Sequence, residues 1–184
     1  REGDVTALGF YFDRERVHAT EESDLISSVF NAWSSDRLAG HETMMLASTR
    51  VAVNELNDLA RSQRLAECEG WEWDSVVLSS GLRASAGDLV VTRKNDRSLR
   101  LSANDFVRNG DRWRVQSVGG DGSMDVVHQR SGKCLHLPKD YVRRHVDLGY
   151  AVTIHGAQGL TADTCHVAVS GTESRQQLYV AMSR

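Results

Sequence analysis

The first eighty residues alternate between helical and strand-like patterns of apolar positions. Residues 9–20 alternate around a charged turn and predict a hairpin. Apolar positions at helical spacing then predict a helix that Thr20 or Ser23 caps and Gly40 ends, with an apolar face made by Leu25, Ile26, Val29, Phe30 and Trp33. The apolar run at 44–48 predicts a buried strand. A second helix follows, and its apolar face carries Val53, Leu56, Leu59 and Ala60. A buried strand between helices indicates a parallel sheet covered by helices.

From Val76 the period changes to two and turn residues become frequent. The predicted short strands are 87–93, 111–118, 123–129 and 133–138. Glycine-containing hairpin signals lie between them at 109–111 and 119–122. Short strands joined by tight turns predict a small β-barrel. After the barrel the chain returns to strand–loop–strand over 150–170, followed by a helix from about Ser174.

We therefore expect an α/β fold, a parallel sheet with helices on both faces, interrupted by an inserted small β-barrel. The first part of the α/β domain would span residues 1–82, the barrel 83–147 and the second part 148–184. Charge changes at nearly the same boundaries. Residues 83–146 hold 13 Lys and Arg against 7 Asp and Glu, while the rest of the chain holds 9 against 18. This asymmetry is expected where one module faces a polyanion, although solvated surface charge gives the same count.

Composition argues against two classes of protein. No apolar run approaches the ~20 residues that cross a bilayer, and no signal peptide opens the sequence. The three cysteines are scattered without a CxxC pair: Cys68, Cys134 and Cys165. This pattern favours reduced thiols over a disulfide framework or a zinc site. We expect a cytoplasmic protein with no membrane segment and no metal site of its own.

The loop at 153–161 carries more polar side chains than a plain connection needs. They belong to Thr153, His155, Gln158 and Thr161, and Gly159 lies among them. Loops carry function more often than the strands they join, so this loop is the first candidate site.

Four blocks of sequence, in order, resemble superfamily 1 helicases of the RecD/TraI type. TIHGAQGLT (153–161) and QQLYVAMSR (176–184) resemble the fifth and sixth helicase motifs, and MMLASTRVAVNELN (44–57) resembles the fourth. The stretch that begins GDLVVTRKNDRSLRL at residue 87 resembles the SH3-like barrel that such helicases insert in their second RecA-like domain. The overall resemblance is closest to the helicase part of actinobacterial conjugative relaxases of the TraA/TrwC type.

The resemblance implies a role for each polar residue of these motifs. Arg50 and Arg184 match two arginine positions that stabilise charge on the transferring phosphoryl group, which a planar guanidinium does bidentately. Gln158 would bond the γ-phosphate or its attacking water, and Gly159 would let the backbone approach closely. The side chains that would contact the phosphates of single-stranded DNA are Thr153, His155 and Thr161.

In this family the barrel borders the single-strand channel. Its basic side chains would neutralise phosphates, and the chosen candidates are Arg93, Lys94, Arg97 and Arg108. Arg112 and Arg114 add further charge. Trp113 alternates with these charged neighbours, which favours core packing over base stacking. The pattern gives no function to Trp71 and Trp73.

Two parts of an ATP-hydrolysing motor are absent from the sequence. It contains no GxxxxGK followed by Ser or Thr, and no Asp-Glu pair that would hold Mg²⁺. We therefore expect ATP and Mg²⁺ to be held mainly by an upstream RecA-like domain of a longer protein. On its own, this chain would bind neither cofactor and would be inactive.

The predicted function is the second motor domain of an ATP-dependent 5′-to-3′ DNA helicase, within a conjugative relaxase. Its partners would be single-stranded DNA and the upstream domain. One alternative is a repair helicase of the RecD-like kind. The other is a non-enzymatic module that binds nucleic acid or a protein.

Overall fold

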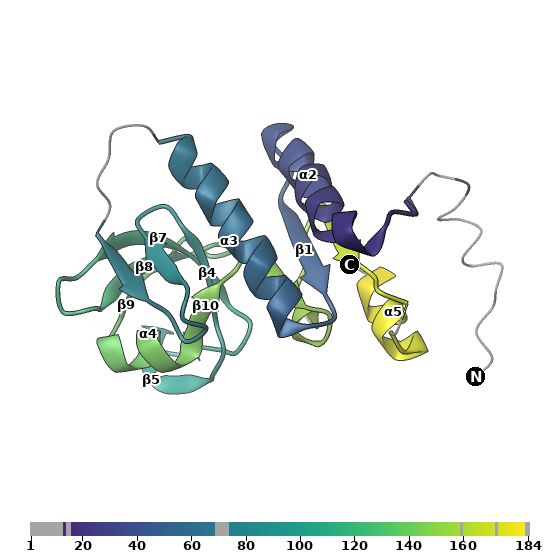
Figure 1. The fold of residues 1–184 in the computed structure, drawn as a ribbon. Coiled ribbons are helices and arrows are strands. Elements are labelled where there is room, and N and C mark those ends of the chain that lie inside the picture. Colours follow the sequence, from purple (N-terminus) through teal and green to yellow (C-terminus); the bar gives the residue numbers. More distant parts are fainter. Residues whose placement is uncertain (1–12, 14–15, 69–73, 159, 172, 183–184) are drawn as a thin grey trace.

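The computed structural model describes residues 13, 16–68, 74–158, 160–171 and 173–182. Figure 1 shows two modules side by side, a parallel sheet with its helices and an antiparallel barrel. Half of the predicted hairpin at 9–20 lies outside the described residues, and 16–20 have no regular secondary structure.

The parallel sheet has three strands in the order β11-β1-β12. Their bounds are β1 Thr43–Ala47, β11 Ala151–Thr153 and β12 Thr164–Ala168. All five residues of the central strand are buried, as its apolar sequence predicts. Ala47 pairs with Thr153 on one side and Ala168 on the other, so the three carboxyl ends lie at one edge.

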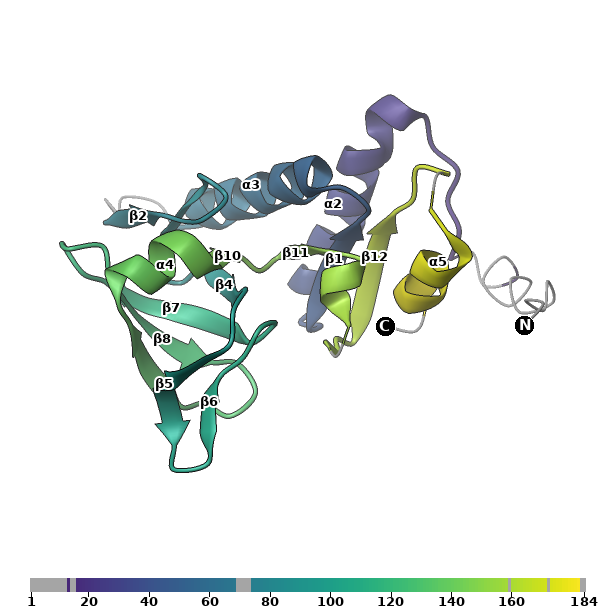
Figure 2. The same ribbon diagram turned by 90° about the horizontal axis from the view of Figure 1, so that it is seen from below.

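Helices cover both faces of this sheet, as predicted. They are α2 (Leu25–Leu38), α3 (Arg50–Ala66) and α5 (Arg175–Met182). Met45 and Ala47 share a hydrophobic cluster with residues of α2 and α3, among them Trp33, Val53 and Leu56. Met44 and Leu46 point to the other face and join a second cluster with Ala181 of α5. In Figure 2, α2 and α5 accordingly lie on opposite sides of β12.

The helix ends agree with the sequence in part. Gly40 has φ 88° and follows α2, with the His41 amide bonded to the Asp36 carbonyl, so the predicted stop is confirmed. The predicted cap of α2 is wrong. A 3-10 turn (η1, Glu22–Asp24) precedes the helix. Asp24 is the N-cap residue of α2, and its side chain makes no capping hydrogen bond. Leu59 was expected on the apolar face of α3 but is exposed, since α3 turns it away from the sheet.

The barrel is built on a five-stranded antiparallel sheet in the order β10-β4-β7-β8-β9. Its strands are β4 Leu89–Thr92, β7 Arg112–Val118, β8 Met124–His128, β9 Cys134–Leu137 and β10 Val146–Leu148. Four of these match the predicted strands. Trp113 is fully buried among Val90, Val115, Met124, Val126 and Leu137, which confirms that it packs in the core.

Besides strand β10, two hairpins and one helix of this module were not predicted. Two short hairpins flank the sheet, β2 Ser75–Val77 with β3 Arg83–Ser85 and β5 Asp96–Ser102 with β6 Asp105–Val107. The β5–β6 hairpin projects from the barrel (Figure 2). A short helix, α4 (Lys139–His145), follows Pro138 and buries Tyr141 and Val142.

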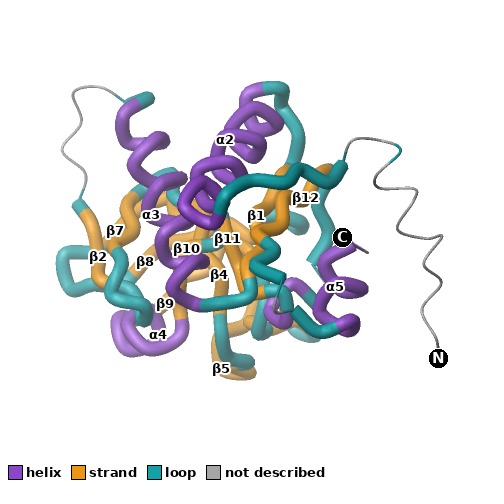
Figure 3. The backbone as a smooth tube through the Cα atoms, turned by 45° about the vertical axis from the view of Figure 1, so that its right-hand side comes forward, coloured by secondary structure: helices purple, strands orange, loops and turns teal. Residues whose placement is uncertain are grey.

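Helix α3 lies beside both the parallel sheet and the barrel (Figure 3) and connects the two through buried polar groups. Asp88, in the turn before β4, is fully buried. Its carboxylate accepts hydrogen bonds from Arg61 Nε at 3.2 Å, Arg64 Nε at 2.7 Å and the Tyr150 hydroxyl at 2.8 Å. The barrel is thus fastened to α3 and to the linker after β10.

Candidate nucleotide and nucleic-acid interface

The carboxyl edge of the parallel sheet gathers several predicted site residues. In open α/β sheets, ligands bind beyond the carboxyl ends of the strands. Here the segment after β1 leads to Arg50, and the segment after β11 contains His155. Arg50 is exposed as the first residue of α3, and no ion pair or hydrogen bond connects its guanidinium to the described residues. Thr49, whose hydroxyl accepts the Ala52 amide at 3.2 Å, caps the helix and fixes where Arg50 begins it.

Glu173 connects two segments of this edge, and sequence reasoning missed it. Its carboxylate accepts from the Ser48 hydroxyl after β1, the Ser170 amide at 3.0 Å and the Gly171 amide at 2.9 Å. Burial opposes the charged form, but the bonds from Ser48 and Ser170 outweigh it and lower the pKa of Glu173 to about 2. The signal was a Ser-Gly turn followed by an acid just ahead of a helix.

Helix α5 begins with a reciprocal cap. The Gln177 amide donates to Ser174 Oγ at 3.3 Å, and the Ser174 amide donates to Gln177 Oε1 at 2.7 Å. This capping box explains the predicted start of the helix at about Ser174. The helix packs against the loop after β11, so the fifth- and sixth-motif blocks lie together.

The loop after β11 turns back on itself through a 3-10 turn, η2 (His155–Ala157). The Gly156 amide donates to Thr153 Oγ1 at 3.1 Å, so this hydroxyl is engaged within the loop. The barrel residue Arg93 lies against the same turn, because a Cβ built on Gly156 would lie 3.3 Å from Arg93 Nη1. Asp147 holds Arg93 there through an ion pair of 3.2 Å. The structure therefore brings Arg93 to the predicted loop.

Further along, the loop faces the barrel across a cleft of about 550 Å³. Gln158, Leu160 and Thr161 line it from the loop side. The barrel side is formed by two connections and neighbouring strand residues, including Arg108, Asn109, Asp111, Arg112, Gln129 and Arg130. Arg130 was not among the predicted residues, yet its Nη2 donates to Thr161 Oγ1 at 3.3 Å.

Arg112 is the most buried guanidinium of the cleft. Its side chain is 7% exposed and donates to Glu42 Oε1 at 3.4 Å and to the Gly149 carbonyl at 3.3 Å. Burial lowers its pKa, although the nearby Glu42 carboxylate acts in the opposite direction. These bonds tie barrel strand β7 to the segment before β1 and to the linker after β10.

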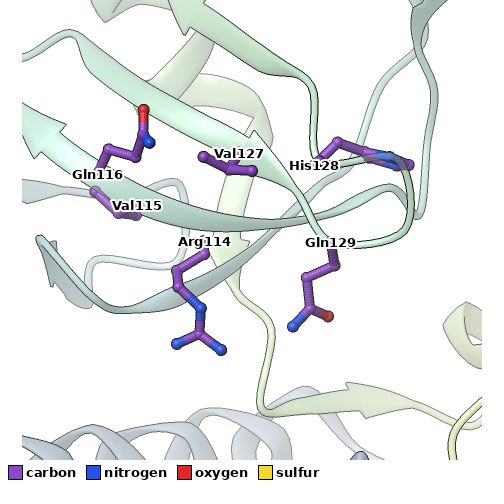
Figure 4. A pocket seen from close by; sticks show the side chains of 7 residues that line it. Arg114, Val115, Gln116, Val127, His128 and Gln129 are labelled. Atoms are coloured by element: carbon purple, nitrogen blue, oxygen red, sulfur yellow. The ribbon is translucent and has the colours of Figure 1, made fainter.

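The remaining basic candidates are dispersed over the barrel. Arg97 and Arg108 stack over the Phe106 ring, with guanidinium carbons 5.6 and 5.4 Å from its centroid. Lys94 is exposed just before this hairpin. Arg114 lines a second hollow of about 380 Å³, where its side chain and that of Gln129 point the same way (Figure 4).

Some predicted residues lie outside the described part of the chain: Gly159, Arg184, Trp71 and Trp73. Within the described residues, no group of three His, Cys, Asp or Glu side chains could hold a metal ion. The same residues include no helix long and apolar enough to span a membrane.

Comparisons with known proteins give the family context. Residues 76–147 match the model described as the Rv2311 SH3-like barrel domain. The uncharacterized protein Rv2311 of Mycobacterium tuberculosis is 39% identical over 55% of this chain and 58% of its own length. The conjugal transfer protein TraA of Agrobacterium fabrum is 28% identical over 97% of this chain, and the multifunctional conjugation protein TraI of Escherichia coli is 33% identical over 56%. The chain spans only 16% of TraA and 6% of TraI.

Solved structures give the same context at the level of fold. A chain from a structure of two Pif1 helicases at forked double-stranded DNA matches 90% of this chain and 45% of its own length, with TM-score 0.53 and 21% identity. Pif1 helicase from Candida albicans matches 88% of this chain and 50% of its own length, with TM-score 0.50 and 17% identity. The chain has a helicase-related fold. It combines this fold with sequence similarity to conjugal transfer proteins.

Proposed function

We propose that this chain is the second RecA-like motor domain of an ATP-dependent 5′-to-3′ DNA helicase, within a conjugative relaxase of the TraA/TrwC type. The domain would run from 1–82 to 148–184, with the SH3-like barrel inserted at 83–147. An upstream domain of the longer protein would supply the phosphate-binding loop and the Mg²⁺ ligands, which this sequence lacks. The similarity to TraA over 97% of the chain supports the conjugative assignment.

One observation carries the proposal, the position of Arg50. Arg50 begins α3 directly beyond the carboxyl end of β1. The neighbouring strand β11 ends at Thr153, where the predicted loop begins. An exposed guanidinium without a carboxylate partner in the described chain can reach a phosphoryl group held by a facing domain. Arg184 and Gln158 would act on the same group, and Gly159 would admit it.

The second half of the proposal is contact with single-stranded DNA. His155 is exposed on the 3-10 turn, and Arg93 lies against that turn. Thr161 lines the cleft from the loop side and Arg108 lines it from the barrel side. Thr153, Lys94 and Arg97 complete the proposed contacts. A DNA strand bound on this surface would contact both the loop and the barrel. A change in the nucleotide bound at the carboxyl edge of the sheet could therefore move the DNA.

The test uses the longer protein that carries both RecA-like domains. Unwinding of a duplex with a 5′ single-stranded tail is measured beside the same duplex with a 3′ tail, with and without ATP. We expect ATP-dependent unwinding from the 5′ tail only. Binding of DNA without any ATP hydrolysis would instead support the non-enzymatic module.

A further inference from the structure

Among the described residues that line the cleft between barrel and loop, one arginine has no carboxylate partner. Arg108 pairs with Asp105 at 3.4 Å, and Arg112 pairs with Glu42 at 3.4 Å. Arg130 instead bonds the neutral hydroxyl of Thr161, and no carboxylate of the described residues lies within ion-pair distance of it. The barrel wall of the cleft, as far as described residues form it, therefore presents a guanidinium that an anion could pair with.

The buried guanidinium in the same cleft also has unused hydrogen-bonding capacity. Arg112 Nε is buried and has no partner among the described residues, while its two other bonds are long, at 3.3 and 3.4 Å. Since Nε itself is buried, an incoming oxygen acceptor could only take over the long bonds of the two outer nitrogens.

The balance of charge limits which anion fits. Three arginines line the cleft (Arg108, Arg112 and Arg130), and so do three carboxylates (Glu42, Asp105 and Asp111). A triphosphate would bring several negative charges beside these carboxylates. A phosphodiester brings one charge and two free oxygens, which suits a single unpaired guanidinium.

We propose that this cleft binds one phosphodiester group of single-stranded nucleic acid, held by Arg130 and Thr161, with the Arg112 guanidinium lining the same cleft. The assignment of the ligand to DNA rests on the proposed function. The cleft, at about 550 Å³, has room for the attached nucleoside, and the Gln129 and Gln158 amides line it.

The site would be shared by the two modules. Arg130 belongs to the connection between β8 and β9 of the barrel, while Thr161 belongs to the loop that leads into β12. A phosphodiester bound to both would replace their direct bond and hold the barrel against the loop.

Affinity for fluorescein-labelled oligothymidylate, measured by anisotropy over a range of KCl concentrations, tests this site in the present chain. Arg130→Gln is compared with Lys133→Gln, which removes the same charge from the same connection but outside the cleft. We expect Arg130→Gln to weaken binding about tenfold and to reduce the salt slope by about 0.7, and Lys133→Gln to change affinity less than about twofold. Thr161→Val, which keeps the shape of the side chain, should weaken binding about threefold.

The outcomes separate this inference from the proposed function. Equal effects of Arg130→Gln and Lys133→Gln, with binding by the unmodified chain, would overturn the cleft site alone. Absence of salt-dependent binding by the unmodified chain would overturn both the DNA contacts and the site. Displacement of the oligonucleotide by ATP at equal phosphate concentration would overturn the assignment to a phosphodiester.

Discussion

Tyr150 donates its hydroxyl hydrogen to Asp88 Oδ1 over 2.8 Å, where the linker after β10 meets the turn before β4. Burial and the neighbouring Asp88 carboxylate raise the pKa of Tyr150, so the phenol stays a donor at all ordinary pH values. With Arg61 and Arg64 on the same carboxylate, this bond joins the barrel, α3 and the parallel sheet. Arg50 is the first residue of α3. The junction therefore connects the barrel, through α3, to the proposed nucleotide edge.

Asp88→Asn should destabilise the protein strongly, because it leaves two partly buried guanidinium groups without their carboxylate. We expect a loss of about 3 kcal/mol in the free energy of unfolding, measured by urea denaturation. Asp105→Asn is the matched control, since its pair with Arg108 is solvent-exposed and should be worth less than about 1 kcal/mol. Equal losses in the two variants would show that the junction contributes no more than a surface pair.

Asn57 takes the place of a neighbouring strand at the free edge of β11. Its buried side chain donates to the Ala151 carbonyl at 3.0 Å and accepts the Ala151 amide at 2.9 Å. Asn57→Ala should therefore cost about 2–4 kcal/mol of unfolding free energy, because two buried backbone groups lose their partners. Hydrogen exchange at the Ala151 amide should become faster.

Asn54→Ala, one turn earlier on the same helix, is the control for Asn57 and should change stability by less than about 1 kcal/mol. Equal losses of unfolding free energy in the two asparagine variants would contradict a stabilising role for the two Asn57–Ala151 hydrogen bonds.

Glu173 gives a pH-dependent prediction. Burial opposes its charge, yet the bonds from Ser48 and Ser170 lower its pKa to about 2, below the value of about 4.3 for an unfolded Glu. The stabilisation from the charged form is complete above about pH 4.5 and is lost as the pH falls towards 2. At pH 7, Glu173→Gln should lower the free energy of unfolding by about 1–2 kcal/mol. Below about pH 4.5 the difference in unfolding free energy between this variant and the unmodified protein should shrink.

Thermal unfolding of the two proteins between pH 3 and pH 8 measures this effect. Glu55→Gln, at an exposed site on α3, should change stability by less than about 0.5 kcal/mol. A Glu173→Gln effect that stays constant with pH would contradict the proposed role of the carboxylate in holding the strand ends.

The sequence predicted those parts of the fold whose pattern is local. The run at 44–48 is apolar because β1 is buried on both faces, and strong turn signals separate β7 from β8. The β5–β6 hairpin was missed because most of β5 faces solvent, which leaves only Leu99 and Leu101 as apolar markers. The short α4 has too few turns for a periodic pattern.

The candidate site divides in the same way. Arg50 and the 153–161 loop belong to continuous motifs and could be found from the sequence. Arg130 contacts Thr161, 31 residues further along the chain, and Glu173 contacts Ser48, which is 125 residues before it, so only the fold shows these two contacts. The basic candidates on the barrel were grouped by composition, yet the structure separates Arg93 at the loop from Arg97 on the projecting hairpin.

The most direct measurement is DNA-stimulated ATP hydrolysis by the longer protein that carries both RecA-like domains, with Arg50→Ala compared with Arg143→Ala on the exposed side of α4. If Arg50 stabilises the transferring phosphoryl group, turnover should fall about 1,000-fold while ATP affinity stays within about threefold. Arg50→Lys should recover little, since an ammonium does not reproduce the bidentate contact. Turnover in Arg50→Ala equal to that of Arg143→Ala would contradict the placement of this residue at the nucleotide.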